Sequence, residues 1–142
     1  MIATILPGST NFHAVGYNER KIAKGTARLL EIKNFGTLGT FGKPTPDELV
    51  SYLMEYTSRN DRIQKAQFHV AFSCKGHEMS ESEVLEFAHQ YLKEMGYMEE
   101  GQPLLAYSHY DTDNTHVHIV TSRIAPDGRK IEHDNERRLR RK

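Results

Sequence analysis

The stretch PLLAYSHYDTDNTHVHIVTSR, residues 103–123, decides the fold of this 142-residue chain. It contains two runs with the composition and spacing of β-strands, residues 103–110 and 116–123. The sequence between them, Asp-Thr-Asp-Asn-Thr at 111–115, is rich in turn-forming residues. The stretch therefore predicts a hairpin of two antiparallel strands, beside which the remaining elements can be placed.

Further strands and helices are predicted from the rest of the chain. Residues 67–73 alternate between apolar and polar side chains, and residues 1–6 supply a short additional strand. Capping boxes at Thr45–Glu48 and Ser80–Glu83 predict the starts of two helices with apolar stripes. A third helix is predicted over about residues 12–24. Together these elements indicate one α+β domain, in which helices flank a central antiparallel sheet.

Composition excludes several classes of protein. The chain has a polar beginning and no long apolar run, which predicts neither a signal peptide nor membrane insertion. Its single cysteine, Cys74, cannot form an internal disulfide, so we expect a cytoplasmic protein. The 19 Lys and Arg residues balance 19 Asp and Glu residues, and this net charge of zero gives no general sign of an anionic partner.

Charge is nevertheless segregated along the sequence. Basic residues outnumber acidic ones in residues 1–35, and the sign is reversed in residues 76–102. The end of the chain is basic again, at Arg137, Arg138, Arg140, Arg141 and Lys142. An anionic partner therefore remains compatible with the neutral total.

The densest group of functional residues is His109-Tyr-Asp-Thr-Asp-Asn-Thr-His-Val-His118. Side chains alternate along a strand, so His116 and His118 share one face. If the hairpin closes as predicted, His109 lies opposite His116 on that face, with Cβ atoms roughly 5 Å apart. Three neutral imidazoles beside open positions are typical of a catalytic metal site. Asp111 is close enough in the sequence to orient one of them.

The alternatives to a metal site are weaker. A single histidine on a strand is usually a half-buried polar residue, but three at compatible spacing favour a metal role. Three imidazoles suit Zn²⁺ or another transition ion, whereas phosphate chemistry commonly uses Mg²⁺ or Mn²⁺. The residue types do not distinguish between these ions. His69 lies on the less apolar face of its strand and could come near the site, although a core or edge position is the simpler interpretation. The glycine-rich stretch 35–42 lacks a Gly-Lys-Ser/Thr ending and is interpreted as a mobile loop.

Tyr17 lies on a basic helix face. Its neighbours three, four and seven positions on are Arg20, Lys21 and Lys24, and Arg28 continues the stripe if the helix extends past Gly25. From the helix alone, a tyrosine packed against basic side chains is the simpler interpretation. Beside a bound cation the phenol becomes a candidate nucleophile, because positive charge favours the phenolate and a metal polarises a phosphate oxygen.

These residues resemble the mobilisation relaxases of plasmids and mobilisable elements, which belong to the HUH endonuclease superfamily. The resemblance is carried by the pattern His-x-Asp-x-x-Asn-x-His-x-His at 109–118, followed by an apolar strand and Arg123. It extends to GSTNFHAVGYNERKIAKG at 8–25 and to FHVAFSCKGHEMSESEVLEFAHQYLKEMGY at 68–97. The type found in Bacteroides mobilisable elements is especially similar.

The resemblance implies a specific activity. Such enzymes nick single-stranded DNA at an origin of transfer and keep a 5′-phosphotyrosyl link while they release a 3′-hydroxyl. It implies that His109, His116 and His118 bind a divalent metal, with Mg²⁺ or Mn²⁺ favoured and Zn²⁺ or Ni²⁺ possible in a purified sample. It makes Tyr17 the nucleophile and Asp111 a base or an orienting residue.

The resemblance also implies a fold and partners. The family fold is a helix-flanked antiparallel sheet related to the RNA-recognition motif. Contacts to single-stranded DNA are expected from Arg20, Lys21, Lys24, Arg28, Arg123 and the basic end of the chain. Accessory mobilisation proteins and a coupling protein are expected partners. Because full relaxases are longer than 142 residues, we expect residues 1–142 to be a nuclease domain truncated at its C-terminus.

Three other functions remain open from the sequence. A replication initiator or transposase-type nuclease shares the histidine chemistry, but places its tyrosine after the histidines, and no tyrosine follows Tyr110. A metal-dependent phosphodiesterase would activate water and form no protein-linked DNA. A non-catalytic nucleic-acid-binding module would use the three histidines only for packing.

Overall fold

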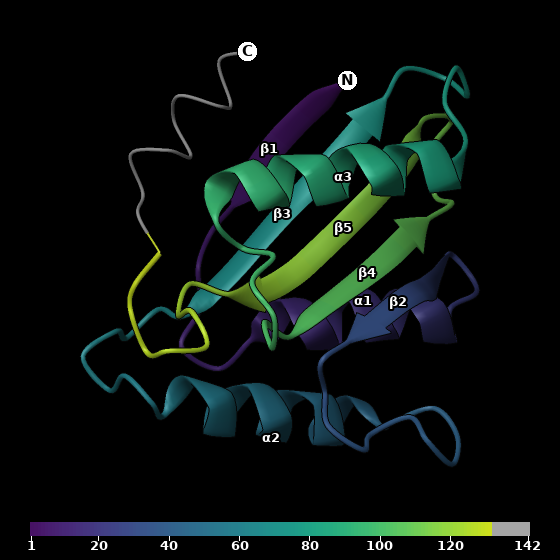
Figure 1. Cartoon of the computed structure of the whole chain (residues 1–142). Coiled ribbons are helices and arrows are strands. Elements are labelled where there is room, and N and C mark those ends of the chain that lie inside the picture. Colours follow the sequence, from purple (N-terminus) through teal and green to yellow (C-terminus); the bar gives the residue numbers. More distant parts are fainter. Residues whose placement is uncertain (132–142) are drawn as a thin grey trace.

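The predicted α+β class is confirmed by the computed structural model, which describes residues 1–131. The elements in chain order are β1 (Ile2–Leu6), α1 (His13–Ala23), β2 (Ala27–Lys33), α2 (Pro46–Thr57), β3 (Gln67–Cys74), α3 (Glu81–Met95), β4 (Leu104–His109) and β5 (Thr115–Ser122). The strands form one sheet in the order β1-β3-β5-β4-β2, with every neighbouring pair antiparallel. Helix α3 covers one face of the sheet, while α1 and α2 lie on the other (Figure 1).

The predicted hairpin lies near the centre of the sheet. Strands β4 and β5 pair in a continuous register from Leu104 opposite Thr121 to His109 opposite His116. Strand β3 pairs with the other edge of β5, with Ala71 opposite His118. The hairpin therefore has a neighbouring strand on each side, and its end carries the histidines.

Strand β2 is the element that the sequence did not predict. The helix expected to carry its basic stripe toward Arg28 ends at Ala23, and Lys24 is its C-terminal cap. The chain then reverses through Gly25, which has a φ of +79°. Pairing with β4 provides the backbone hydrogen bonds of residues 27–33, so tertiary contacts override a composition that does not alternate clearly.

Two apolar cores lie on the two faces of the sheet. Toward α3, the alternating face of β3 contributes Phe68, Val70 and Phe72, all fully buried as predicted. Toward α1 and α2, Tyr107 of β4 and Val120 of β5 pack in the second core, among residues of both helices. Because α1 rests on this second face, it also comes to lie near the histidines of the same face.

The predicted helix boundaries are confirmed at their caps. The hydroxyl groups of Thr45 and Ser80 accept hydrogen bonds from the backbone N–H groups of Glu48 and Glu83, at 3.2 Å each. The two glutamates reach back to the cap residues, which completes both capping boxes. Helix α3 ends at Gly96 in the left-handed conformation.

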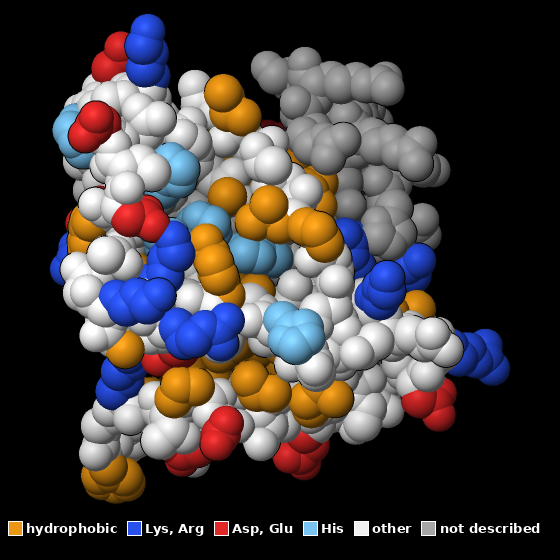
Figure 2. Space-filling view, turned by 180° about the vertical axis from the view of Figure 1, so that it is seen from behind, with side chains coloured by type: hydrophobic (Ala, Val, Ile, Leu, Met, Phe, Trp, Pro, Cys, Tyr) orange, Lys and Arg blue, Asp and Glu red, His pale blue; other side chains and the backbone are white. Residues whose placement is uncertain are grey.

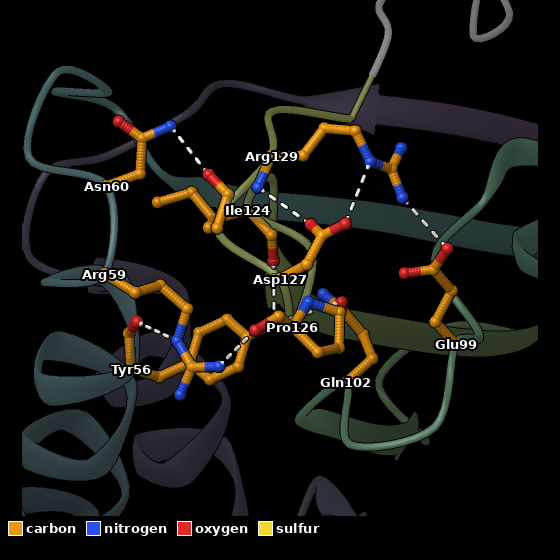
Figure 3. A network of polar contacts seen from close by, with 10 residues as sticks. Tyr56, Arg59, Asn60, Glu99, Gln102, Ile124, Pro126, Asp127 and Arg129 are labelled. Atoms are coloured by element: carbon orange, nitrogen blue, oxygen red, sulfur yellow. Dashed lines mark hydrogen bonds and ion pairs between the residues drawn. The ribbon is translucent and has the colours of Figure 1, made fainter.

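Polar contacts connect the turn after β5 to the end of α2 and the residues that follow it (Figure 3). The Tyr56 hydroxyl donates to the carbonyl of Ile124 at 2.8 Å, and the Arg59 guanidinium donates to the carbonyl of Pro126 at 2.6 Å. The basic residues 137–142 lie outside the described residues. Within residues 1–131, no helix is long and apolar enough to cross a lipid bilayer.

Candidate active site

Three histidines gather where the β4–β5 hairpin faces α1. His109 and His116 lie directly opposite each other in the ladder, as predicted. The His109 and His118 rings are stacked, with centroids 3.9 Å apart and planes 7° from parallel. The His116 ring lies further out, with its centroid 6.4 Å from that of His118. The predicted common face of these histidines is therefore confirmed.

A fourth histidine, His69, joins this group. Its Nε2 lies 2.9 Å from Nδ1 of His118, and only 6% of the residue is exposed. His69 is buried, as the preferred interpretation expected, and it also lies beside the site, which the sequence left open as the alternative. The polar face of residues 67–73 was a usable signal, but the pairing of β3 with β5 is needed to place His69 beside His118.

Tyr17 of α1 lies over the histidine cluster. Its ring centroid is 6.1 Å from that of His109, 6.3 Å from that of His118 and 6.5 Å from that of His69. The residue is 40% exposed, so its side chain is open to a ligand in solution. The Nζ atom of Lys21, one helical turn on, is 5.2 Å from the centre of the tyrosine ring.

Asn18 connects the tyrosine helix to the histidine cluster. Its amide nitrogen donates to the carbonyl of Ala14 at 2.8 Å, which fixes the orientation of the amide group. Its Oδ1 therefore faces Nε2 of His109, at 2.5 Å, and accepts a hydrogen bond from the N–H group of that ring. The remaining nitrogen of His109, Nδ1, is then an acceptor. Asn18 is fully buried, and no pattern in the sequence singles it out for this role.

Burial keeps the inner histidines neutral. It lowers the pKa of His69 and of His109 to about 4, and that of His118 to about 2. Positive charge on the neighbouring imidazoles would add repulsion, which lowers these pKa values further. At neutral pH the cluster therefore offers nitrogen lone pairs instead of positive charge, as metal coordination requires.

Comparison with known families identifies the chain. A family model described as "Relaxase: MobA/VirD2-like, nuclease domain" matches residues 17–142. The chain belongs to this relaxase family. The match includes Tyr17 and the three hairpin histidines. Searches of curated proteins and of solved structures gave no match. The histidine and tyrosine cluster is thus the candidate active site of a DNA-nicking relaxase domain.

Asp111 of this relaxase lies at the edge of the cluster. Its carboxylate forms a hydrogen-bonded ion pair with Lys21. This contact lowers the pKa of Asp111 and raises that of Lys21. Within the described part of the chain, the carboxylate is bonded to this ammonium group and not to an imidazole. A role of Asp111 as base or orienting residue stays a prediction.

The basic residues expected to contact DNA occupy three different places. Lys21 lies beside Tyr17, and Arg20 and Lys24 are exposed on the same helix. Arg28 lies on the opposite face of the sheet and pairs with Glu81 of α3 at 2.6 Å. Arg123 is 9% exposed, and its guanidinium carbon is 4.9 Å from the centre of the Phe68 ring. The structure therefore brings only the α1 residues close to the histidines.

The imidazoles of this relaxase site have the donor chemistry that suits a divalent metal, but they do not converge on one point in this structure. His109, His116 and His118 present imidazoles on one face, and burial keeps His109 and His118 neutral. In residues 1–131, no three His, Cys, Asp or Glu side chains stand in an arrangement that holds a metal ion. His109 uses one nitrogen for Asn18, and His118 uses one for His69. Each ring keeps a second nitrogen for coordination.

Proposed function

We propose that this relaxase domain nicks single-stranded DNA at the origin of transfer of a plasmid or mobilisable element, through attack by Tyr17. The observation that carries the proposal is the position of Tyr17, exposed to solvent over a cluster of neutral imidazoles. Its phenol and the histidines contact the same space, so a phosphate placed there would meet both. The family match over residues 17–142 supports the substrate class.

The proposed reaction is a transesterification. The Tyr17 hydroxyl oxygen forms a bond to phosphorus, while the bond from phosphorus to the 3′-oxygen breaks. The 3′-oxygen takes up a proton and leaves as a hydroxyl, and the 5′-phosphate stays on Tyr17. The phenol proton leaves to a base, for which Asp111 is the predicted residue. The ammonium group of Lys21 stabilises negative charge on the phenol oxygen.

His109, His116 and His118 would hold the metal. A bound Mg²⁺ or Mn²⁺, or Zn²⁺ or Ni²⁺ in a purified sample, would orient the scissile phosphate and neutralise the charge developing on it. Two further residues orient these ligands through hydrogen bonds: His69 bonds to His118, and Asn18 bonds to His109. Such outer contacts fix the tautomer and the orientation of a ligating imidazole.

The proposed partners follow from this reaction. Single-stranded DNA is the substrate, and Lys21, Lys24 and Arg20 are placed to contact its backbone beside Tyr17. Accessory mobilisation proteins and a coupling protein are the further partners that we propose. The proposed reaction would take place in the cytoplasm.

The proposal can be tested without knowledge of the origin sequence. The protein is incubated with Mn²⁺ and a labelled random-sequence library of single-stranded DNA, then separated on a denaturing gel. Wild-type protein should retain label in a covalent adduct, and Tyr17→Phe should retain none. Tyr110→Phe is the matched control, because Tyr110 is 49% exposed and follows His109 directly.

The same gel separates the alternatives. Cleaved DNA without protein-linked label would identify a phosphodiesterase that activates water. A covalent adduct that persists in Tyr17→Phe would place the nucleophile elsewhere, as in an initiator-type nuclease. Binding without cleavage, unchanged by alanine at His116, would identify a non-catalytic module.

A further inference from the structure

A basic cavity lies at the end of the sheet where β1 ends and β3 begins. It has a volume of about 510 Å³ and is lined by Gly8, Arg62, Ile63, Gln64, Lys65, Arg123 and Lys130. These residues come from the segment after β1, the loop before β3 and the segment after β5. Three parts of the chain that are distant in sequence therefore build one concave surface.

Every charged residue that lines the cavity within the described part of the chain is basic. Four of the seven described lining residues are Lys or Arg, and none of the seven is Asp or Glu. Within the described residues, Arg62, Lys65 and Lys130 form no ion pair, and all three are exposed. In a chain of net charge zero, such a concave concentration of one sign attracts an anion.

One buried residue, Gln67, links the chain segment beside the cavity to the beginning of α1. Its Nε2 donates to the carbonyl of Pro7, next to Gly8, at 3.2 Å. Its Oε1 accepts the N–H of Ala14, in the first turn of α1, at 2.8 Å. The cavity thus adjoins the beginning of α1, whereas Lys21 and Lys24 lie toward its end.

Basic groups therefore flank the histidines on two sides. Helix α1 has 11 residues, which corresponds to a length of about 16 Å. Figure 2, which views the face opposite α3, shows Lys and Arg side chains to the left and to the right of the histidines. A chain of regularly spaced phosphates that crosses Tyr17 would meet positive charge before and after it.

We propose that this cavity binds phosphodiester groups of single-stranded DNA, on the side of the active site remote from Lys21 and Lys24. The inference rests on the proposed function, because it gives the cavity the same DNA strand that Tyr17 attacks. It assigns Arg62, Lys65 and Lys130 to phosphate contacts that do not depend on base sequence. Arg123, held against Phe68, forms the inner wall.

The test measures binding of a 20-nucleotide oligo-dT by fluorescence anisotropy, in EDTA and at several salt concentrations. The variant Arg62→Ala/Lys65→Ala should bind several-fold more weakly. Its log–log salt slope should be shallower by about 1.4, which corresponds to two lost phosphate contacts on a single strand. The control Lys33→Ala/Lys93→Ala removes the same charge from exposed positions outside the cavity and should keep the wild-type slope.

Other anions are tested in the same format. Inorganic phosphate at constant ionic strength and a poly-glutamate peptide replace the oligonucleotide as ligands. If the cavity variant binds either of these ligands more weakly than the wild-type protein does, but binds oligo-dT equally well, the cavity binds a free anion or an acidic protein. That result overturns the proposal.

Failure of this proposal can be told from failure of the proposed function. One outcome is that the cavity variant and the control bind oligo-dT equally while the Tyr17 adduct still forms. That result would overturn the cavity proposal and leave the proposed nicking activity standing. No oligo-dT binding by the wild-type protein would contradict both proposals. Circular dichroism of each variant shows whether the fold is kept.

Discussion

The side chains around Tyr17 come from residues that are far from it in the sequence. His69 and His118 surround its ring, although 52 or more positions separate them from it. The hydrogen bond between these two imidazoles and the bond from His109 to Asn18 fix the rings below Tyr17. The cluster is therefore held by side-chain contacts of β3, β4, β5 and α1 together.

Asn18 offers a test at the residue scale. We expect Asn18→Ala to lower the free energy of unfolding by about 1–3 kcal/mol, because it leaves the buried Nε2–H of His109 without its partner. Urea denaturation monitored by circular dichroism measures the change. Arg20→Ala, an exposed position on the same helix, should change it by less than about 0.5 kcal/mol. Equal effects of the two substitutions would refute the assigned role of Asn18.

The buried histidines predict a dependence of stability on pH. In the folded, metal-free protein the pKa values of His69 and His109 are about 4, below the ordinary value of 6.5. The unfolded chain therefore binds more protons below pH 6.5, so this part of the stability is complete above pH 6.5 and is lost as the pH falls toward 4.

The size of this effect can be measured in EDTA. Between pH 7 and pH 5 we expect the free energy of unfolding to fall by on the order of 1 kcal/mol for each buried histidine. Urea unfolding at the two pH values gives the difference, and His69→Asn should reduce it. A wild-type stability that stays constant from pH 7 to pH 5 would disagree with neutral buried imidazoles.

At the scale of elements, two glycines predict opposite effects. Gly96 caps α3 with a φ of +89°, which disfavours a side chain, so Gly96→Ala should destabilise the protein by about 1 kcal/mol. Gly16 lies inside α1, where an added Cβ would meet only the flexible end of Arg20, at 3.2 Å. Gly16→Ala should therefore stabilise by about 0.5–1 kcal/mol.

Thermal unfolding of both alanine variants tests this pair of predictions. The melting temperature should fall for Gly96→Ala and rise for Gly16→Ala, relative to the wild-type protein. A shift in the same direction for both would show that local packing outweighs the backbone conformation at one of the two positions.

The elements differ in how well the sequence predicts them. The two capping boxes and the alternation of residues 67–73 are local signals, and the structure confirms them. Strand β2 has no comparable signal, because its formation depends on pairing with β4. For the same reason His109 and His116 could be paired from one hairpin, whereas placing His69 required the order of strands across the sheet.

At the scale of the whole molecule, one face of the sheet carries the proposed chemistry. Helix α3 and its core close the opposite face, while on this face Tyr17 is exposed over the histidines, with basic side chains on either side (Figure 2). The net charge of zero conceals this arrangement, because acidic residues predominate in residues 76–102, which include α3. A neutral protein can thus present a basic surface to DNA.

The position of the covalent bond tests the central claim most directly. The adduct formed with Mn²⁺ and single-stranded DNA is digested with nuclease and protease, and its peptides are analysed by mass spectrometry. The account predicts that a peptide containing Tyr17 carries the mass of a 5′-phosphorylated nucleotide. A nucleotide attached to a peptide containing Tyr110 or any other residue would contradict it.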